Sequence, residues 1–72
     1  MTNTEKLNRL IRERGLKKVY LAKKVGLTPA GFYNCVNNRA EFKASQILTL
    51  CELLGVDDPA QREALFFDRH GA

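Results

Sequence analysis

Several features that would indicate a membrane, secreted or repetitive protein are missing from this sequence. No apolar run approaches the roughly 20 residues that a helix needs to cross a bilayer. There is no low-complexity tract and no internal repeat. The first ten residues, MTNTEKLNRL, are polar and amphipathic and do not look like a signal peptide. We therefore expect a cytoplasmic protein with no membrane partner.

Side chains that bind metals or carry out covalent chemistry are also scarce. The chain has 2 cysteines, Cys35 and Cys51, and 1 histidine, His70, with no CxxC spacing, so neither a metal site nor a redox motif is expected. Each cysteine falls on the apolar side of an expected helix, where a thiol behaves as a small hydrophobe. Free buried thiols fit a reducing compartment.

Catalytic arrangements are missing as well. No Ser/His/Asp, Cys/His or paired-carboxylate set converges, and a domain of 72 residues has no room for a deep pocket. We therefore expect no enzyme activity, no cofactor, no metal and no small-molecule substrate.

What the sequence does contain is helical periodicity. A chain of this length forms one small domain that buries only about 60 % of its unfolded surface, so helical packing is the expected solution. Apolar residues recur at helical spacing between glycines, prolines and capping residues. The prediction is an all-α fold, a compact five-helix bundle with its core over 4–56 and a C-terminal helix over 58–68. The other expected helices cover 4–14, 17–25, 29–36 and 44–54.

The segment 44–54 has the strongest amphipathic pattern. Its apolar stripe consists of Ile47, Leu50, Cys51 and Leu54, and is widened by Leu48 and Leu53. Phe42 is expected to pack into the core beneath the loop over residues 39–42. Phe66 and Phe67 are adjacent. Either one docks onto the core while the other is exposed or covered by a second copy of the protein, or the monomer covers both.

The stretch from Lys17 to Asn38 organises the chain as two helices joined by a tight turn. Gly26 stands where a helix commonly ends in a left-handed conformation. Thr28 is expected to cap the next helix, with Pro29 at its first position. Ala22 is small enough to let the two helices cross closely. This pattern predicts a helix-turn-helix.

The outward face of the helix over 29–36 carries no charge. It offers the Asn34 carboxamide, which suits an adenine edge, the Ala30 methyl, which suits a thymine methyl, and the Tyr33 phenol. Gly31 disfavours a helix interior, so either the backbone there comes very near another molecule, for which we favour DNA, or the position is under no selection. Tyr20 either gives its hydroxyl to a phosphate or covers the edge of the core.

Charge is distributed unevenly along the chain. Residues 1–43 hold ten basic and three acidic side chains, a net charge of +7, whereas residues 44–72 carry −3. The basic half contains the helix-turn-helix pattern, which favours a polyanionic partner on one face. Lys17 and Lys18 open a helix whose free N–H groups suit a phosphate, and Lys43 stands near the start of another.

Together, the motifs Leu21-Ala22, Gly26-Leu27-Thr28, Phe32, Asn37 and Leu50-Cys51-x-x-Leu54-Gly55-Val56 resemble the lambda-repressor-like (Cro/repressor) helix-turn-helix family over roughly residues 5–56. The tail, with REALFF after an acidic cap, looks like small phage-encoded members. The resemblance implies five helices around one core, a helix over 29–36 in the major groove, and dimers on paired half-sites about 34 Å apart.

The resemblance also implies a set of contacts. Base contacts fall at Pro29, Ala30, Tyr33 and Asn34. With the neighbouring basic residues included, expected phosphate contacts are Lys17, Lys18, Thr28, Asn37, Asn38, Arg39 and Lys43. This chain departs from the family's usual polar residues at 29–31 and from its usual glycine at 38. That departure gives more weight to apolar contacts, water and DNA shape.

The function expected on these grounds is sequence-specific transcriptional regulation, as a phage-type repressor that binds double-stranded DNA as a homodimer. Phe66 and Phe67 are the expected dimer interface. The alternative is a protein-interaction adaptor or antitoxin-like module that uses the C-terminal helix, because small domains of this shape also serve such roles.

Overall fold

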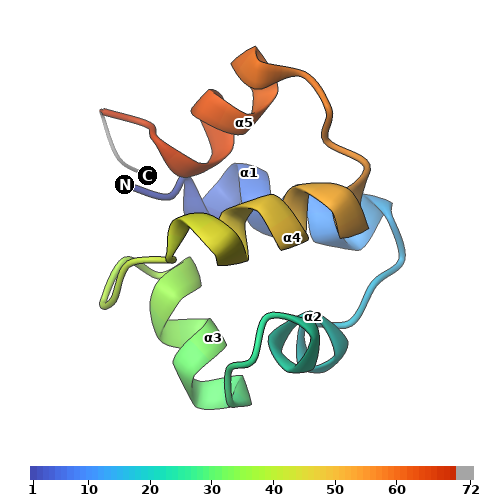
Figure 1. Ribbon diagram of the computed structural model, residues 1–72, viewed down its shortest axis with the longest axis vertical. Coiled ribbons are helices and arrows are strands. Elements are labelled where there is room, and N and C mark those ends of the chain that lie inside the picture. Colours follow the sequence, from blue (N-terminus) through green and yellow to red (C-terminus); the bar gives the residue numbers. More distant parts are fainter. Residues whose placement is uncertain (70–72) are drawn as a thin grey trace.

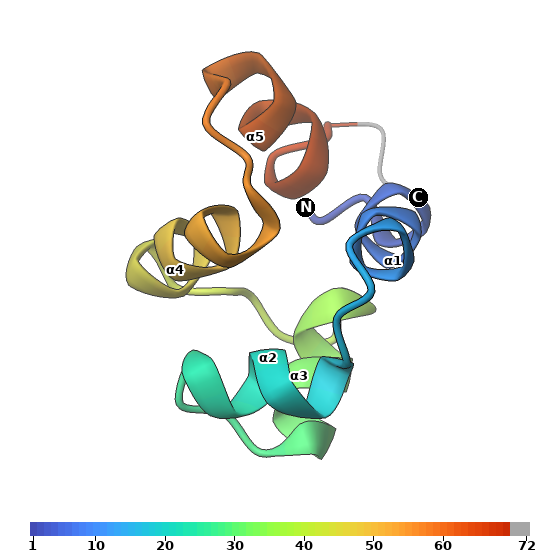
Figure 2. The ribbon, with the colours of Figure 1, turned by 90° about the vertical axis from the view of Figure 1, so that its right-hand side faces the viewer.

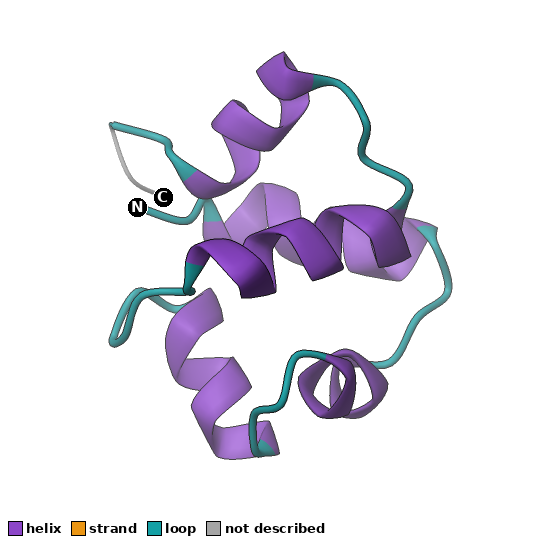
Figure 3. Cartoon of the chain, viewed as in Figure 1, coloured by secondary structure: helices purple, strands orange, loops and turns teal. Residues whose placement is uncertain are grey.

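Five helices and their connections make up the computed structural model, which describes residues 1–69 (Figures 1 and 3). They are α1 (Thr4–Glu13), α2 (Lys18–Lys24), α3 (Pro29–Val36), α4 (Ala44–Leu54) and α5 (Pro59–Phe66). That part of the chain contains no strand, so the all-α prediction is confirmed. None of its helices is long and apolar enough to cross a membrane. His70 lies outside the described residues.

Capping side chains start three of the helices. Asn3 accepts a hydrogen bond from the Lys6 N–H at α1, Thr28 from Gly31 at α3, and Asp58 from Ala60 at α5. A proline occupies the first turn of both α3 and α5, where its missing N–H has no intrahelical partner to lose. These local signals are why the starts of α1, α3 and α5 match the prediction to within one residue.

The expected end of α5 at residue 68 is wrong. The helix ends at Phe66, and Phe67 is its C-cap. The N–H of Asp68 donates to the Met1 carbonyl oxygen at 2.9 Å instead of continuing the helix. A tertiary hydrogen bond to the N-terminal segment therefore ends the helix two residues early.

The helices enclose one core. α1 and α4 lie on opposite sides of it, with α5 across one end and α2 and α3 across the other (Figures 1 and 2). The predicted stripe of α4 is buried, with Leu50 and Leu54 at 0 % exposure. Leu48 is 53 % exposed, so its expected place in the stripe is wrong. It stands about 100° around the helix from Ile47, outside the sector that faces the core.

Three phenylalanine rings cross the core in edge-to-face contacts. The ring centroids of Phe32 and Phe42 lie 5.7 Å apart, and those of Phe42 and Phe66 lie 5.8 Å apart. This geometry is favourable for aromatic quadrupoles. Phe42 therefore packs beneath its loop, as predicted, and links α3 to α5.

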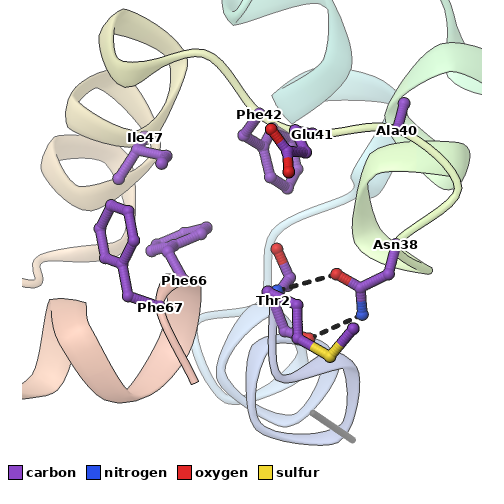
Figure 4. A pocket seen from close by; sticks show the side chains of 9 residues that line it. Thr2, Asn38, Ala40, Glu41, Phe42, Ile47, Phe66 and Phe67 are labelled. Carbon is purple, nitrogen blue, oxygen red and sulfur yellow. Dashed lines mark hydrogen bonds between the residues drawn. The ribbon is translucent and has the colours of Figure 1, made fainter. Parts of the chain in front are cut away.

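The adjacent phenylalanines separate as expected, with one docked and one exposed. Phe66 is 4 % exposed and Phe67 is 48 % exposed. Assigning Phe66 to a dimer surface is therefore wrong, because the chain's own core already covers its ring. Figure 4 shows the two rings beside Ile47 at the edge of a pocket.

Residues 1–4, here called the N-terminal strap, connect the ends of α3 and α5. The Thr2 N–H donates to the Asn38 side-chain oxygen, and the Thr4 hydroxyl donates to the Val36 carbonyl. On the other side, the Asn3 N–H donates to the Leu65 carbonyl at 2.8 Å. The strap thus bridges two helix ends that are far apart in sequence.

The contrast between the two phenylalanines gives a stability prediction. Replacing Phe66 by alanine should lower the free energy of unfolding by about 3–5 kcal/mol, because it leaves a cavity in the core. The same change at Phe67 should cost about 1 kcal/mol or less. Urea unfolding at low protein concentration measures both, and equal losses would contradict the placement of the two rings.

Candidate nucleic-acid interface

The turn between α2 and α3 is fixed by backbone hydrogen bonds. Gly26 has a φ of 76°, in the left-handed region. Its N–H donates to the Lys23 carbonyl at 3.2 Å, and the Leu27 N–H donates to the Ala22 carbonyl at 2.9 Å. This pair of bonds is a Schellman motif, which satisfies the last carbonyls of α2 and turns the chain sharply.

Close packing holds the two helices together beyond the turn. Leu21 and Ala22 on α2 are 0 % and 1 % exposed, and Phe32 and Val36 on α3 are each 1 % exposed. Because Ala22 has only a methyl group, the helices approach closely where they meet. α3 is therefore held along its inner face, and its outer face is fixed relative to the rest of the domain.

The hydrogen bond that caps α3 gives a reason within the chain for glycine at position 31. The Thr28 hydroxyl oxygen accepts a hydrogen bond from the Gly31 N–H at 3.0 Å. A Cβ at position 31 would lie 3.2 Å from that hydroxyl oxygen and 3.7 Å from a Leu27 methyl. The approach to the hydroxyl oxygen is tighter than most Cβ contacts, whereas the approach to Leu27 is an ordinary van der Waals contact. Glycine therefore relieves crowding at the cap, so its presence needs no close approach to DNA.

The outer face of α3 consists of Pro29, Ala30, Tyr33 and Asn34, here called the recognition face. Pro29 and Ala30 are exposed, Tyr33 is 53 % exposed and Asn34 is partly exposed. Within residues 1–69 the Asn34 carboxamide makes no hydrogen bond, so its donor and acceptor both remain available. The face has no charge, as the sequence predicts.

Lysines stand at the starts of the two helices that precede and follow α3. Lys17 caps α2 and Lys43 caps α4, neither with a side-chain hydrogen bond to the helix, and Lys18 opens α2. None of α2, α3 and α4 has an acidic residue in its first turn. A cation at a helix N-terminus opposes the helix dipole, so these lysines do not stabilise the helices. Together with the free N–H groups they create an electropositive surface suited to phosphate.

Two cations are held over aromatic rings on the same helices. The Arg39 guanidinium lies 5.9 Å from the centre of the Tyr33 ring, and the Lys24 ammonium lies 5.6 Å from that of Tyr20. Both distances are within the range of cation–π attraction. Arg39 is thereby kept beside the recognition face. Tyr20 is 43 % exposed, which is compatible with either role expected for it, and nothing in the structure explains the exposed Val19.

The cysteines, the potential metal ligands and a pocket beside Phe66 were considered as possible catalytic features. Burial raises the pKa of the Cys35 thiol, and it also raises that of Cys51 against a smaller opposing effect of the Arg62 charge. Both thiols are therefore protonated at neutral pH and poorly nucleophilic. In residues 1–69 no three His, Cys, Asp or Glu side chains gather as metal ligands. A pocket of about 250 Å³ beside Phe66 has a single carboxylate, Glu41, in its lining (Figure 4).

A family model for the Cro/C1-type helix-turn-helix DNA-binding domain matches residues 6–61. The match includes all of the helix-turn-helix, α4 and the start of α5. The chain belongs to this Cro/C1-type family. No curated protein and no solved structure matches the chain significantly. The resemblance seen in the sequence is thereby confirmed.

Most of the expected contact residues of this Cro/C1-type domain are on α2, on α3 and in the loop after α3. Asn38 differs from the rest. Its φ of 64° confirms the expected left-handed turn, but its side chain is occupied. The side-chain oxygen accepts from the Thr2 N–H, and the side-chain nitrogen donates to the Thr2 carbonyl, both at 2.8 Å. The carboxamide is thus already bonded within the chain, and the phosphate contact expected at Asn38 stays a prediction.

Asn37 and Thr28 are also engaged within the chain. The Asn37 side chain donates to the Tyr33 carbonyl at 2.9 Å, and the Thr28 hydroxyl oxygen accepts from Gly31. The Thr28 hydroxyl still has a proton to donate, and the Asn37 amide has a second one. Both residues therefore keep a donor that a phosphate would accept.

Sequence reasoning missed two positioning residues of the Cro/C1-type domain. The side chain of Gln46 accepts from the Lys43 N–H at 2.8 Å and donates to the Val25 carbonyl at 3.4 Å. Arg14 donates from Nε to the Leu54 carbonyl at 2.8 Å, at the end of α4. A glutamine three residues after a helix start is the second half of a capping box, which is a detectable signal for Gln46. No local pattern marks Arg14.

Proposed function

We propose that this Cro/C1-type domain is a sequence-specific transcriptional regulator that inserts α3 into a major groove. The observation that carries the proposal is the exposed, uncharged recognition face, with Arg39 held over Tyr33 and lysines at the starts of α2 and α4. The eight residues of α3 span about 12 Å at 1.5 Å per residue, comparable to a major groove about 12 Å wide. Cations on both sides would bind the two phosphate backbones and orient the helix.

The recognition face suits direct contact with base edges. Asn34 has a donor and an acceptor, which match the N6 and N7 groups of adenine. The Ala30 methyl and the Pro29 ring provide apolar contact for a thymine methyl, and Tyr33 adds an aromatic surface with a hydroxyl. Since this set is small and largely apolar, DNA shape and bridging water would supply part of the selectivity.

Phosphate contacts are assigned to the side chains that surround this face. They are Lys17, Lys18, Thr28, Asn37, Arg39 and Lys43. Such contacts add affinity without reading sequence. Occupation of an operator by a domain of this kind is itself enough to repress transcription, which is the phage-type action that the sequence favours.

We also propose that the protein binds paired half-sites as a homodimer, with Phe67 in the interface. This ring is 48 % exposed at the end of α5. In Figure 1, α5 lies at the opposite end of the domain from α2 and the start of α3. A second copy bound there would leave both recognition faces uncovered. The exposed Phe67 and Leu48 are also what favours the alternative, an adaptor or antitoxin-like module.

DNA binding and adaptor function differ in their salt dependence. The logarithm of the affinity for duplex DNA should fall with the logarithm of salt concentration by about 0.9 per neutralised phosphate. With several phosphates contacted, the slope should reach several units, and selection from a random DNA pool should return a common sequence. A flat dependence with no enriched sequence would favour the adaptor.

Asn34 and Lys18 are assigned different roles, and their substitutions should separate them. Asn34→Ala should reduce discrimination at one base pair by about 1–3 kcal/mol, because it removes a bidentate contact. Lys18→Ala should lower the affinity for all DNA sequences to a similar degree, and it should lower the slope of log affinity against log salt concentration by about 1. Affinities for the selected sequence and its single mismatches measure both effects. Equal losses on every sequence for both variants would refute these roles.

The dimer surface is tested by Phe67→Ser, which should yield a monomer because it removes the exposed aromatic ring. About half of the Phe67 side chain is exposed, so the variant should stay folded. Sedimentation equilibrium of wild type and variant gives the mass directly. Leu48→Ser, which changes another exposed apolar residue on a different helix, is the control. A dimer that persists in Phe67→Ser would place the interface elsewhere.

A further inference from the structure

Asn38 stands at a position where glycine would be the simpler choice. Its φ of 64° lies in the left-handed region, which glycine adopts at no steric cost. The carboxamide must therefore contribute something that offsets this conformational cost. Both of its ends bond the backbone of one residue, Thr2, at 2.8 Å each (Figure 4). The side chain thus satisfies both backbone polar groups of Thr2, and it holds the N-terminal strap against the turn that follows α3.

A second contact holds the strap to α3 itself. The Thr4 hydroxyl donates to the Val36 carbonyl at 2.7 Å. Val36 is the last residue of α3, and the carbonyls at a helix end have no intrahelical donor. Thr2 is 6 % exposed, so the strap is packed and not merely laid on the surface. Two contacts, at 36 and 38, therefore fix the C-terminal end of the helix.

The other side of the strap is fixed to α5. The Asn3 N–H donates to the Leu65 carbonyl, and the Asn3 side-chain nitrogen donates to an Asp68 carboxylate oxygen, both at 2.8 Å. The Asp68 N–H donates to the Met1 carbonyl at 2.9 Å. Because the strap is anchored on α5, it is a fixed support against which the end of α3 is held.

This support bears directly on the recognition face. Asn34 is one helical turn before Asn38, and its carbonyl accepts the Arg39 N–H at 2.8 Å and the Ala40 N–H at 3.3 Å. A shift in the turn after α3 would therefore move Asn34 and the Arg39 side chain that covers Tyr33. The cations at the start of α2 belong to a different element and would not move with it.

We propose that the N-terminal strap positions the recognition helix, and that Asn38 is the positioning residue through which it controls sequence selectivity. The part of the inference that concerns sequence selectivity rests on the proposed function. Its structural part, that the strap orders the end of α3, concerns the free protein alone. The two parts are therefore tested by separate measurements.

The decisive variant is Asn38→Gly, which keeps the left-handed backbone and removes only the carboxamide. Thr4→Val is the second variant, since it preserves side-chain shape and removes the donor to Val36. Each should lower the ratio of affinities for selected and random duplex DNA by about tenfold, the scale of one misaligned base contact. Affinity for random DNA should fall by much less than this ratio, and its salt slope by about 1 at most, because Lys17 and Lys18 on α2 keep their phosphate contacts while only Asn37 and Arg39 lie in the turn.

Arg14→Met is the matched control. It also removes a side-chain hydrogen bond to the last carbonyl of a helix, but that helix is α4, away from the strap. Its selectivity ratio should equal that of wild type at a temperature where circular dichroism shows every variant folded. Loss of selectivity in this control as large as in Asn38→Gly would assign the effect to general destabilisation and overturn the inference.

Amide hydrogen exchange of the free protein gives the second readout. In Asn38→Gly and Thr4→Val, the Asn37 and Arg39 amide protons should exchange faster than the same protons in Arg14→Met, under conditions where the variants have comparable free energies of unfolding. Unchanged exchange and unchanged selectivity would overturn the inference and leave the proposed function standing. If wild type selects no sequence at all, the proposed function fails, and the exchange rates alone decide whether the strap orders α3.

Discussion

The close contact between α2 and α3 is the constraint on which the rest of the structure depends. It requires a small residue at Ala22, which is 1 % exposed, and a left-handed residue at Gly26. A larger side chain at 22 would separate the helices, and a Cβ at 26 would strain the turn. Because both conditions are met, α3 is held by one face and presents the other to solvent. α1, α4 and α5 complete the core behind this pair.

Local signals explain how much of this fold was predictable from sequence. α3 and α4 have the predicted bounds because caps, prolines and glycines act within a few residues of where they stand. The uncharged recognition face was predictable for the same reason, since helical spacing alone decides which side chains turn outward. Leu48 was misplaced because periodicity gives the direction of a side chain and not the width of the surface that covers it.

The remaining errors involve contacts between residues distant in sequence. The bonds between Asn38 and Thr2 were not expected, because the two residues are 36 positions apart and no local pattern predicts such a pairing. Likewise, the choice of Phe66 over Phe67 for the core depends on the position of Phe42. Side chains that join distant segments are therefore the part of the site that only the three-dimensional structure reveals.

The distribution of aromatic residues makes this domain unusually simple to follow by optical spectroscopy. The sequence has no tryptophan and 2 tyrosines, Tyr20 and Tyr33. Both are on the helix-turn-helix, and both are substantially exposed. Tyrosine emission of the intact chain therefore arises from α2 and α3 alone, with no tryptophan or buried tyrosine to add a background signal. The unlabelled protein thus carries its own fluorescent reporter on the two helices proposed to approach DNA.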